Sequence, residues 1–391
     1  MPNVTTATSA TKHTGKKKVN SLAAGRLKDS VAPLLLVAAF VVSGIIFGLM
    51  WMTSGDEFSK VNERTGQLTV NFNWGGWMAL AAVLYLVAIY WVSRTVEGAR
   101  QAKNRLVSGL LLTAFILAMI PLLSLVFSLV VRGVPGLGLE HFFTSDASRP
   151  GQKGALHAIV GTLWITLLTT LISVPIGIFT AIYLVEYGKG NFLSRAINFF
   201  VDVMTGVPSI VAGLFAYALF LLIVQQTGGT LTNIRSGFVG AIALMVLMIP
   251  TVVRSAQEMI RLVPPDLREA SYALGVPKWR TIVRVVLPTC LAGLVTGVLL
   301  AIARVIGETA PLLVAAGFSI NMNTNPFQGI MTSLPVFVYN QHGGSFQLVG
   351  NAKHEAEMLA WGGAFILLVI VIVLNLIGRV ISHYFSPKGN R

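Results

Sequence analysis

Two ionisable residues lie inside one of the most apolar stretches of the chain. Arg304 and Glu308 are four residues apart between Leu291 and Gly317, a stretch with no other charged side chain. An arginine at the centre of a membrane helix costs at least about 2.5–3.5 kcal/mol. The spacing predicts that both side chains project from one face of a helix and form an ion pair. Such a pair should face the protein interior or a water-filled path.

The guanidinium group of Arg304 indicates which ligand the pair would bind. Its planar fork of donors matches phosphate or carboxylate oxygens, and it keeps its charge. Glu308 would hold Arg304 in place and limit how tightly an anion is bound, as a site that must release its ligand requires. The alternative is a structural ion pair that locks two helices together.

A second pair with the same spacing, Arg254 and Glu258, lies at the cytoplasmic end of an apolar stretch. Extension of a long basic side chain to the membrane surface explains this pair more simply than substrate binding. We expect no catalytic residue and no metal site, because the histidines are scattered without metal-ligand spacing. The candidate residues for a substrate path are Arg304, Glu308, Thr309 and Arg254.

The composition indicates lipid as the main solvent of this chain. Of its 391 residues, 54% are hydrophobic and only 11% are charged, whereas soluble domains carry about 25% charged residues. The net charge is +14. Because the basic residues lie mostly between apolar stretches, they resemble the cytoplasmic loops of a membrane protein and not a nucleic-acid-binding face.

Eight apolar stretches are candidates for helices that cross a bilayer, which takes about 20 residues. The basic tail, the basic loops and the C-terminal end place both termini in the cytoplasm, in agreement with an even number of spans. The sequence therefore predicts an all-α polytopic membrane protein. The stretches are 31–52, 76–92, 106–131, 160–185, 204–224, 238–260, 289–317 and 359–383.

Helix-breaking residues interrupt several of these stretches. In lipid, a broken helix is tolerated where protein or a water-filled cavity satisfies the freed backbone groups, and such breaks often mark a transport path. A simple kink that helps packing is the alternative. In the extracytoplasmic segment 318–358, an apolar run over 329–339 predicts an interfacial or re-entrant helix. The breakers are Pro175 with Gly177, Gly206 with Pro208, Pro250, and Gly307 with Pro311.

The cytoplasmic loop 261–288 has the signals of a short helix, a sharp turn and another short helix. Pro264 and Pro265 suit a helix start, because a missing N–H costs nothing there. Gly275 can adopt the left-handed conformation that ends a helix, and Pro277 opens the next one. An apolar side then forms, made of Leu267, Ala270, Leu274 and Trp279. This side would suit a groove on a partner protein and the bilayer surface equally well.

The same loop resembles the EAA loop of ABC import permeases, in which Glu-Ala-Ala and a Gly precede an Ile-x-Leu-Pro motif. Here Ser271 replaces the third residue of Glu-Ala-Ala, and Val285 replaces the Ile. The resemblance implies that 264–288 contains the helix that docks into a cleft of an ATPase. The implied docking residues are Glu269, Ala270, Ser271, Leu274 and Gly275. No phosphate-binding loop with Gly-Lys-Ser/Thr is present in the chain, so we expect ATP and Mg²⁺ on that partner.

The segment 303–313 resembles the signature of phosphate-importer permeases of the PstA type, and 158–163, 181–187 and 206–210 resemble other parts of that family. The resemblance implies a type I ABC importer permease fold with a six-helix core. The expected organisation is a basic cytoplasmic tail over 1–30, an added hairpin over 31–105 and the core over 106–391, with the family region at 157–383.

The same resemblance implies a four-part importer in the bacterial cytoplasmic membrane. Its other parts are a PstC-type permease as heterodimer partner, a PstB-type ATPase homodimer and an extracytoplasmic phosphate-binding protein. The alternatives are an ABC permease for molybdate or sulfate, a self-sufficient secondary transporter, and a membrane enzyme or sensor. Arg304 alone does not separate the oxyanions, and only the Gly-Glu-Thr-Ala-Pro similarity favours phosphate.

Overall fold

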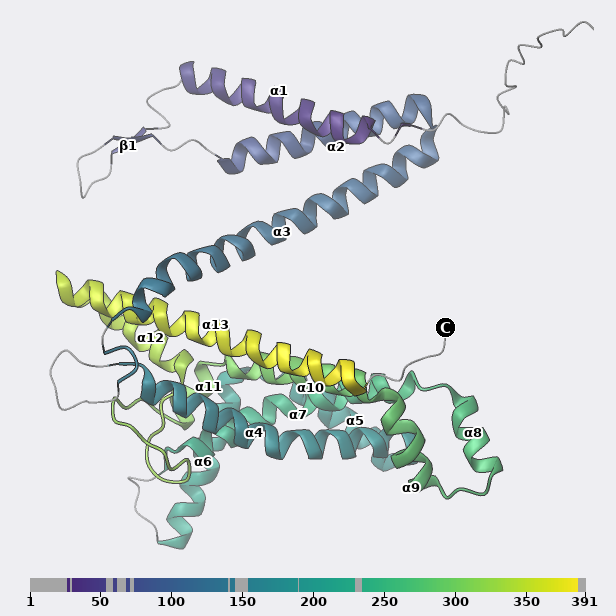
Figure 1. Cartoon of the computed structure of the whole chain (residues 1–391), viewed down its shortest axis with the longest axis vertical. Helices are drawn as coiled ribbons and strands as arrows, with labels where there is room; N and C mark the ends of the chain where they lie inside the picture. The colour runs from purple at the N-terminus through teal and green to yellow at the C-terminus, as the bar shows by residue number, and fades with distance from the viewer. Residues whose placement is uncertain are drawn as a thin grey trace, which may run out of the picture. The chain divides into compact units, whose positions relative to one another are not determined.

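The computed structural model (Figure 1) forms two units that meet within one long helix, between Ser124 and Leu125. The expected boundary of the added hairpin, 105/106, lies near the start of the same helix and stays a prediction. The described residues are 27–28, 30–53, 59–61, 68–70, 74–139, 141–144, 154–188, 190–228 and 234–385. Most of the predicted basic tail lies outside them.

The first unit contains a pair of apolar helices and the first part of a third. They are α1 (Val31–Thr53), α2 (Trp74–Val96) and α3 (Ala99–Leu137), with a short antiparallel hairpin of β1 (Ser59–Val61) and β2 (Leu68–Val70) between α1 and α2. Ser43 of α1 donates a hydrogen bond of 2.8 Å to the main-chain oxygen of Trp77 on α2. The aromatic rings of Phe40 and Trp77 pack edge to face, with their centroids 5.3 Å apart.

A buried carboxylate joins the three helices of the first unit, close to the start of α1, the end of α2 and the start of α3. Glu97 accepts hydrogen bonds from the Leu27 N–H at 2.9 Å, the Ser93 hydroxyl at 2.7 Å and the Arg105 Nε at 2.6 Å. The Arg105 guanidinium, helped by the other two donors, lowers the pKa of Glu97 from 4.5 to about 2, against the opposing effect of burial. The carboxylate therefore ties the start of α1 and the end of α2 to α3.

The second unit holds the rest of α3 and the remaining helices. Two of them, η1 and η3, are single π-helical turns at the ends of long helices. The elements are α4 (Leu156–Ile182), η1 (Tyr183–Tyr187), α5 (Phe192–Thr205), α6 (Ser209–Thr227), α7 (Gly237–Arg261), α8 (Pro265–Ala273), α9 (Lys278–Thr281), η3 (Ile282–Val286), α10 (Leu287–Ile306), α11 (Ala310–Ala315), α12 (Leu334–Ser345) and α13 (Asn351–Phe385).

Helix α7 is the centre of this unit and packs against α4, α5, α6, α10 and α11. Its Leu244, Met248 and Val252 lie in a buried cluster with residues of α4, α10, α11 and the loop before α12. Two glycines of α10 let this helix approach α7 closely. A Cβ on Gly293 would lie 2.3 Å from the Met259 sulfur, and one on Gly297 would lie 2.6 Å from the Ser255 Cβ. Helices α7 and α10 are therefore antiparallel neighbours.

The number and the places of the predicted spans are confirmed. Eight helices of the described chain are long and apolar enough to cross a membrane, and each overlaps one predicted stretch. The all-α fold is also confirmed, with the three-residue strands as a local addition. Helices α8 and α9 lie at one end of the second unit and α12 lies at the other (Figure 1), as the opposite sides predicted for the 261–288 loop and the 318–358 segment require.

Pro175 and Pro250 lie inside the continuous helices α4 and α7, in agreement with the alternative to a broken helix, because a helix within a packed bundle tolerates a proline without ending. Two other expectations about local structure need correction. The predicted span 289–317 is not one helix, since α10 ends at Ile306 and α11 begins at Ala310. The helix predicted from Gly329 begins only at Leu334, because Gly329 has a positive φ of 73° and belongs to a turn.

Candidate functional site

Helix α8 has the start and the end that its sequence predicts. Pro264 is the N-cap, Pro265 is the first helical residue, and Gly275 has the positive φ of 72° that ends the helix. The face away from the core leaves Glu269, Ala270 and Leu274 open, and Leu274 is 83% exposed. An exposed apolar face on a short, well-ended helix is what a groove on a partner accepts.

Ser271 has a different position from the other predicted docking residues. It is buried, and its Oγ lies 2.8 Å from the Oγ1 of Thr281 in the next helix. This hydrogen bond closes the turn between α8 and α9. Ser271 thus shapes the loop from inside, whereas Glu269, Ala270, Leu274 and Gly275 are exposed.

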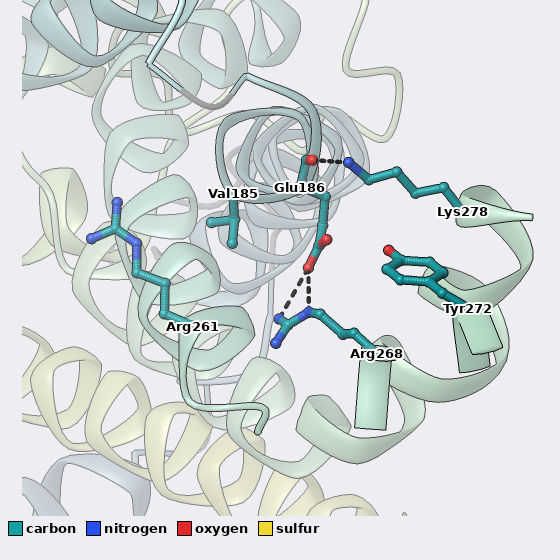
Figure 2. A pocket seen from close by; sticks show the side chains of 6 residues that line it. All are labelled: Val185, Glu186, Arg261, Arg268, Tyr272 and Lys278. Carbon is teal, nitrogen blue, oxygen red and sulfur yellow. Dashed lines mark hydrogen bonds and ion pairs between the residues drawn. The ribbon is translucent and has the colours of Figure 1, made fainter. Parts of the chain in front are cut away.

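The inner side of α8 faces a pocket of about 460 Å³ at the C-terminal ends of α4 and α7. Figure 2 shows Glu186 reaching between Arg268 of α8 and Lys278 of α9. Arg268 forms a buried ion pair with Glu186, with 3.0 Å between Nη2 and Oε1. Sequence analysis missed Glu186, and the available signal was a lone carboxylate ending an otherwise apolar span. The pocket is lined by Val185, Glu186, Arg261, Arg268, Tyr272 and Lys278.

Arg304 lies on a face of α10 that the described chain leaves uncovered. Thr296, Leu300 and Arg304 are exposed at successive turns of the helix. Because Gly297 of α10 packs against Ser255 of α7, the antiparallel register places Arg304 opposite the middle part of α7. The arginine is therefore far from both ends of the neighbouring span, as an intramembrane residue must be.

The predicted ion pair between Arg304 and Glu308 is wrong. Helix α10 ends at Ile306, with Gly307 as its C-cap, so Glu308 lies beyond the helix. The four-residue spacing places two side chains on one face only while the helix continues. Among the described residues, the side chains of Arg304 and Glu308 have no hydrogen bond or ion pair, and Glu308 donates only its main-chain N–H, to the Val305 oxygen. The donors of the guanidinium remain available to a ligand or to another chain.

Two helix breaks of the sequence prediction are real, and the segments that follow them pack together. Residues 206–208 separate α5 from α6, and residues 307–309 separate α10 from α11. A Cβ on Gly213 of α6 would lie 2.6 Å from the Cα of Pro311 in α11. The backbones of α6 and α11 therefore touch, and the half-buried Thr309 occupies the N-cap position of α11 beside this contact, without a capping side-chain hydrogen bond.

The predicted pair between Arg254 and Glu258 is also wrong. Arg254 forms an ion pair with Asp202 of α5 and donates to the Gln257 Oε1 at 3.1 Å. Helix α5 packs against α7 and supplies a nearer carboxylate from a distant part of the sequence. Glu258 instead lines a groove of about 450 Å³ between α7 and α10, together with Thr296 and Leu300.

The fold and these features define a class of protein, a multi-pass membrane permease. The family model described as "Binding-protein-dependent transport system inner membrane component" matches residues 173–390, more than half of the chain. A chain of a bacterial alginate ABC transporter, solved in complex with an alginate pentasaccharide-bound periplasmic protein, is similar in structure, with a TM-score of 0.54 and 16% identity. That similarity covers 74% of this chain and 97% of the other, and it shows the shared fold.

Two relatives narrow the class. The phosphate transport system permease protein PstA 1 of Mycobacterium tuberculosis (strain H37Rv) is 42% identical over 293 residues, which is 74% of this chain and 90% of the relative. The protein PstA of Pasteurella multocida (strain Pm70) is 38% identical over 299 residues, which is 76% of this chain and 100% of the relative. The chain belongs to the PstA family of phosphate transport system permeases.

Proposed function

We propose that this chain is the PstA-type permease subunit of an ATP-driven phosphate importer in the bacterial cytoplasmic membrane. The observation that carries the proposal is the 42% identity to a named phosphate permease over nearly all of that relative's length. The site adds a chemical reason, because Arg304 offers a guanidinium fork without a partner in the described chain. That group matches the oxygens of a phosphate anion.

Arg304, Glu308 and Thr309 lie at the break between α10 and α11, and we assign them to one wall of the substrate path. An exposed arginine opposite the middle of a span is costly in lipid, so a second chain or water must cover it. A PstC-type permease forming the opposite wall meets this requirement. Arg254 belongs to this path only at its cytoplasmic side, where Asp202 already neutralises its charge.

The exposed face of α8 suits the cleft of an ATPase, and we propose a PstB-type homodimer as that partner. ATP and Mg²⁺ would be bound there, because this chain has no phosphate-binding loop. An extracytoplasmic phosphate-binding protein would deliver the substrate at the end of the second unit where α12 lies. This chain thus contributes a path and a docking helix and performs no chemical step itself.

Uptake of labelled phosphate by cells that express the complete importer tests the substrate. We expect uptake that depends on ATP and that excess molybdate and sulfate leave largely unchanged. Uptake abolished by molybdate or by sulfate would instead assign the permease to that oxyanion, since Arg304 itself can bind any of them. ATP-independent uptake by this chain alone would make it a secondary transporter.

A further inference from the structure

One arginine of the docking helix contacts the ends of two spans. The Nε of Arg268 donates to the Glu186 Oε1 at 3.0 Å, and Nη1 and Nη2 donate to the main-chain oxygens of Val263 at 2.6 Å and Ile260 at 2.8 Å. Glu186 belongs to the π turn that ends α4, the Ile260 carbonyl belongs to the last turn of α7, and Val263 directly follows the C-cap of that helix. Arg268 therefore connects α8 directly with both α4 and α7.

The loop holds Glu186 from a second side as well. The Lys278 ammonium, at the start of α9, donates to the main-chain oxygen of Glu186 and lies 4.7 Å from the centre of the Tyr187 ring. Figure 2 shows the contacts of Lys278 and Arg268 converging on Glu186. The side chains of Arg268 and Glu186 are 16% and 7% exposed. Because both charges are largely removed from water, removing one leaves the other poorly compensated.

The ion pair adjoins a packed region that reaches three spans. Ile260 and Val263 belong to a buried cluster with Ala181 of α4 and with Val286 and Leu294 of η3 and α10. Two π turns flank the loop, η1 at Glu186 and η3 after α9. Such turns are rare and are found often at functional sites. A displacement of α8 can thus pass through contiguous contacts into α4, α7 and α10.

We propose that Glu186 and Arg268 are positioning residues that transmit movement of the docking helix to α4 and α7. The inference rests on the proposed function, since it takes α8 as the helix that the ATPase engages. Binding and transmission are then divided between the two faces of one helix. The outer face with Leu274 binds the ATPase, and the inner ion pair carries the movement to the spans.

The test uses the importer purified through a tag on this chain and reconstituted in vesicles. Arg268→Gln and Glu186→Gln are made singly and together. Arg261→Gln is the matched control, because Arg261 lines the same pocket but is exposed and has no partner among the described residues. Three quantities are measured for each variant: the ATPase retained in the complex, the rate of ATP hydrolysis, and the phosphate taken up per ATP.

We expect the variants to retain the ATPase while phosphate uptake per ATP falls by about 5- to 150-fold, the usual range of coupling between two sites. The double variant should be no worse than the more affected single variant, because both changes break the same link. The control should equal the wild type. If the neutral variants fail to reach the membrane, Arg268→Lys replaces them. Its single ammonium cannot reach Glu186 and both carbonyl groups, so uptake per ATP should fall again.

Unchanged uptake per ATP in Arg268→Gln or Arg268→Lys would overturn the proposal, and so would losses that simply add in the double variant. Loss of the ATPase from the variants, with normal uptake per ATP in what remains, would show that the ion pair only supports docking. A wild-type complex that contains no ATPase would refute the proposed function itself. That outcome is distinguishable because it appears before any variant is made.

Discussion

Arg304 and Glu308 illustrate how a single helix end changes the role of two charged residues. Because α10 ends between them, they do not neutralise each other within the described chain. Arg304 keeps its donors free on an exposed stripe with Thr296 and Leu300. An arginine there can bind an anion during transport, which a closed ion pair would hinder.

Replacing the Arg304 charge should impair uptake. In Arg304→Gln we expect phosphate uptake at low substrate concentration to fall about 10- to 100-fold, since hydrogen bonds to charged groups contribute about 1.5–3 kcal/mol. Arg304→Lys should recover only part of it, because an ammonium lacks the two-pronged geometry. Arg132→Gln is the control, because this exposed arginine of α3 stacks on the Trp361 ring and is not among the residues assigned to the path. Normal uptake in Arg304→Gln would exclude Arg304 from the path.

Glu97 should make the first unit sensitive to acid. Its pKa is lowered from 4.5 to about 2 in the folded chain, so ionised Glu97 stabilises the fold fully above pH 4.5. This contribution is lost as the pH falls from 4.5 towards 2. At pH 7, Glu97→Gln should lower the free energy of unfolding by about 2 kcal/mol. This value is modest because Arg105 is one-third exposed and can be rehydrated.

Thermal unfolding of the purified wild type and of Glu97→Gln, measured between pH 7 and pH 3, checks this expectation. The difference in stability between the two proteins should shrink as the pH falls below 4.5. A difference that stays constant over that range would show that Glu97 is not the titrating group.

At the scale of helices, the contact between α6 and α11 holds the two breaks in place. Gly213 permits this contact, because any larger side chain would meet the backbone of Pro311. The break at 307–309, which carries Glu308 and Thr309, thus depends on a glycine in another helix. Two interrupted helices packed against each other are a common arrangement around transport sites.

Gly213→Val should separate α6 from α11. Overpacking of this kind costs about 1–3 kcal/mol, and we expect lower thermal stability together with reduced phosphate uptake. The control is Gly343→Ala in α12, where an added Cβ meets no atom within 4 Å. If Gly213→Val transported as well as Gly343→Ala, the packing of α6 on α11 would have no role in the path.

The elements were largely predictable from sequence, and the reason is physical. In lipid every backbone group must be bonded internally, so each long apolar stretch must be a helix. The short helix α8 was also predictable, since Pro265 and Gly275 act on their own backbone. Both predicted ion pairs failed because the four-residue rule ignores helix ends and partners distant in sequence. The partner of Arg254, Asp202, lies on α5, which hydropathy did not reveal because it is not one of the apolar spans.

At the scale of the whole molecule, the two ends of the second unit have different surfaces. Helix α8 presents Leu274 at one end, and Val349, which is 89% exposed, lies after α12 at the other. Between them, Arg304 faces outward from a span. These features fit a subunit that needs partners on the cytoplasmic side and within the membrane, in addition to lipid.

Cross-linking from position 274 tests most directly whether α8 docks an ATPase. The chain's one cysteine, Cys290, is buried, so Leu274→Cys can be addressed selectively, with Val349→Cys as the matched control at the opposite end. In membranes that contain the whole importer, we predict that Leu274→Cys cross-links to the ATPase subunit and is protected from an impermeant thiol reagent added outside. Val349→Cys should react with that reagent and not cross-link to the ATPase. Labelling of Leu274→Cys from outside, or its failure to cross-link in an importer that actively transports phosphate, would contradict the account.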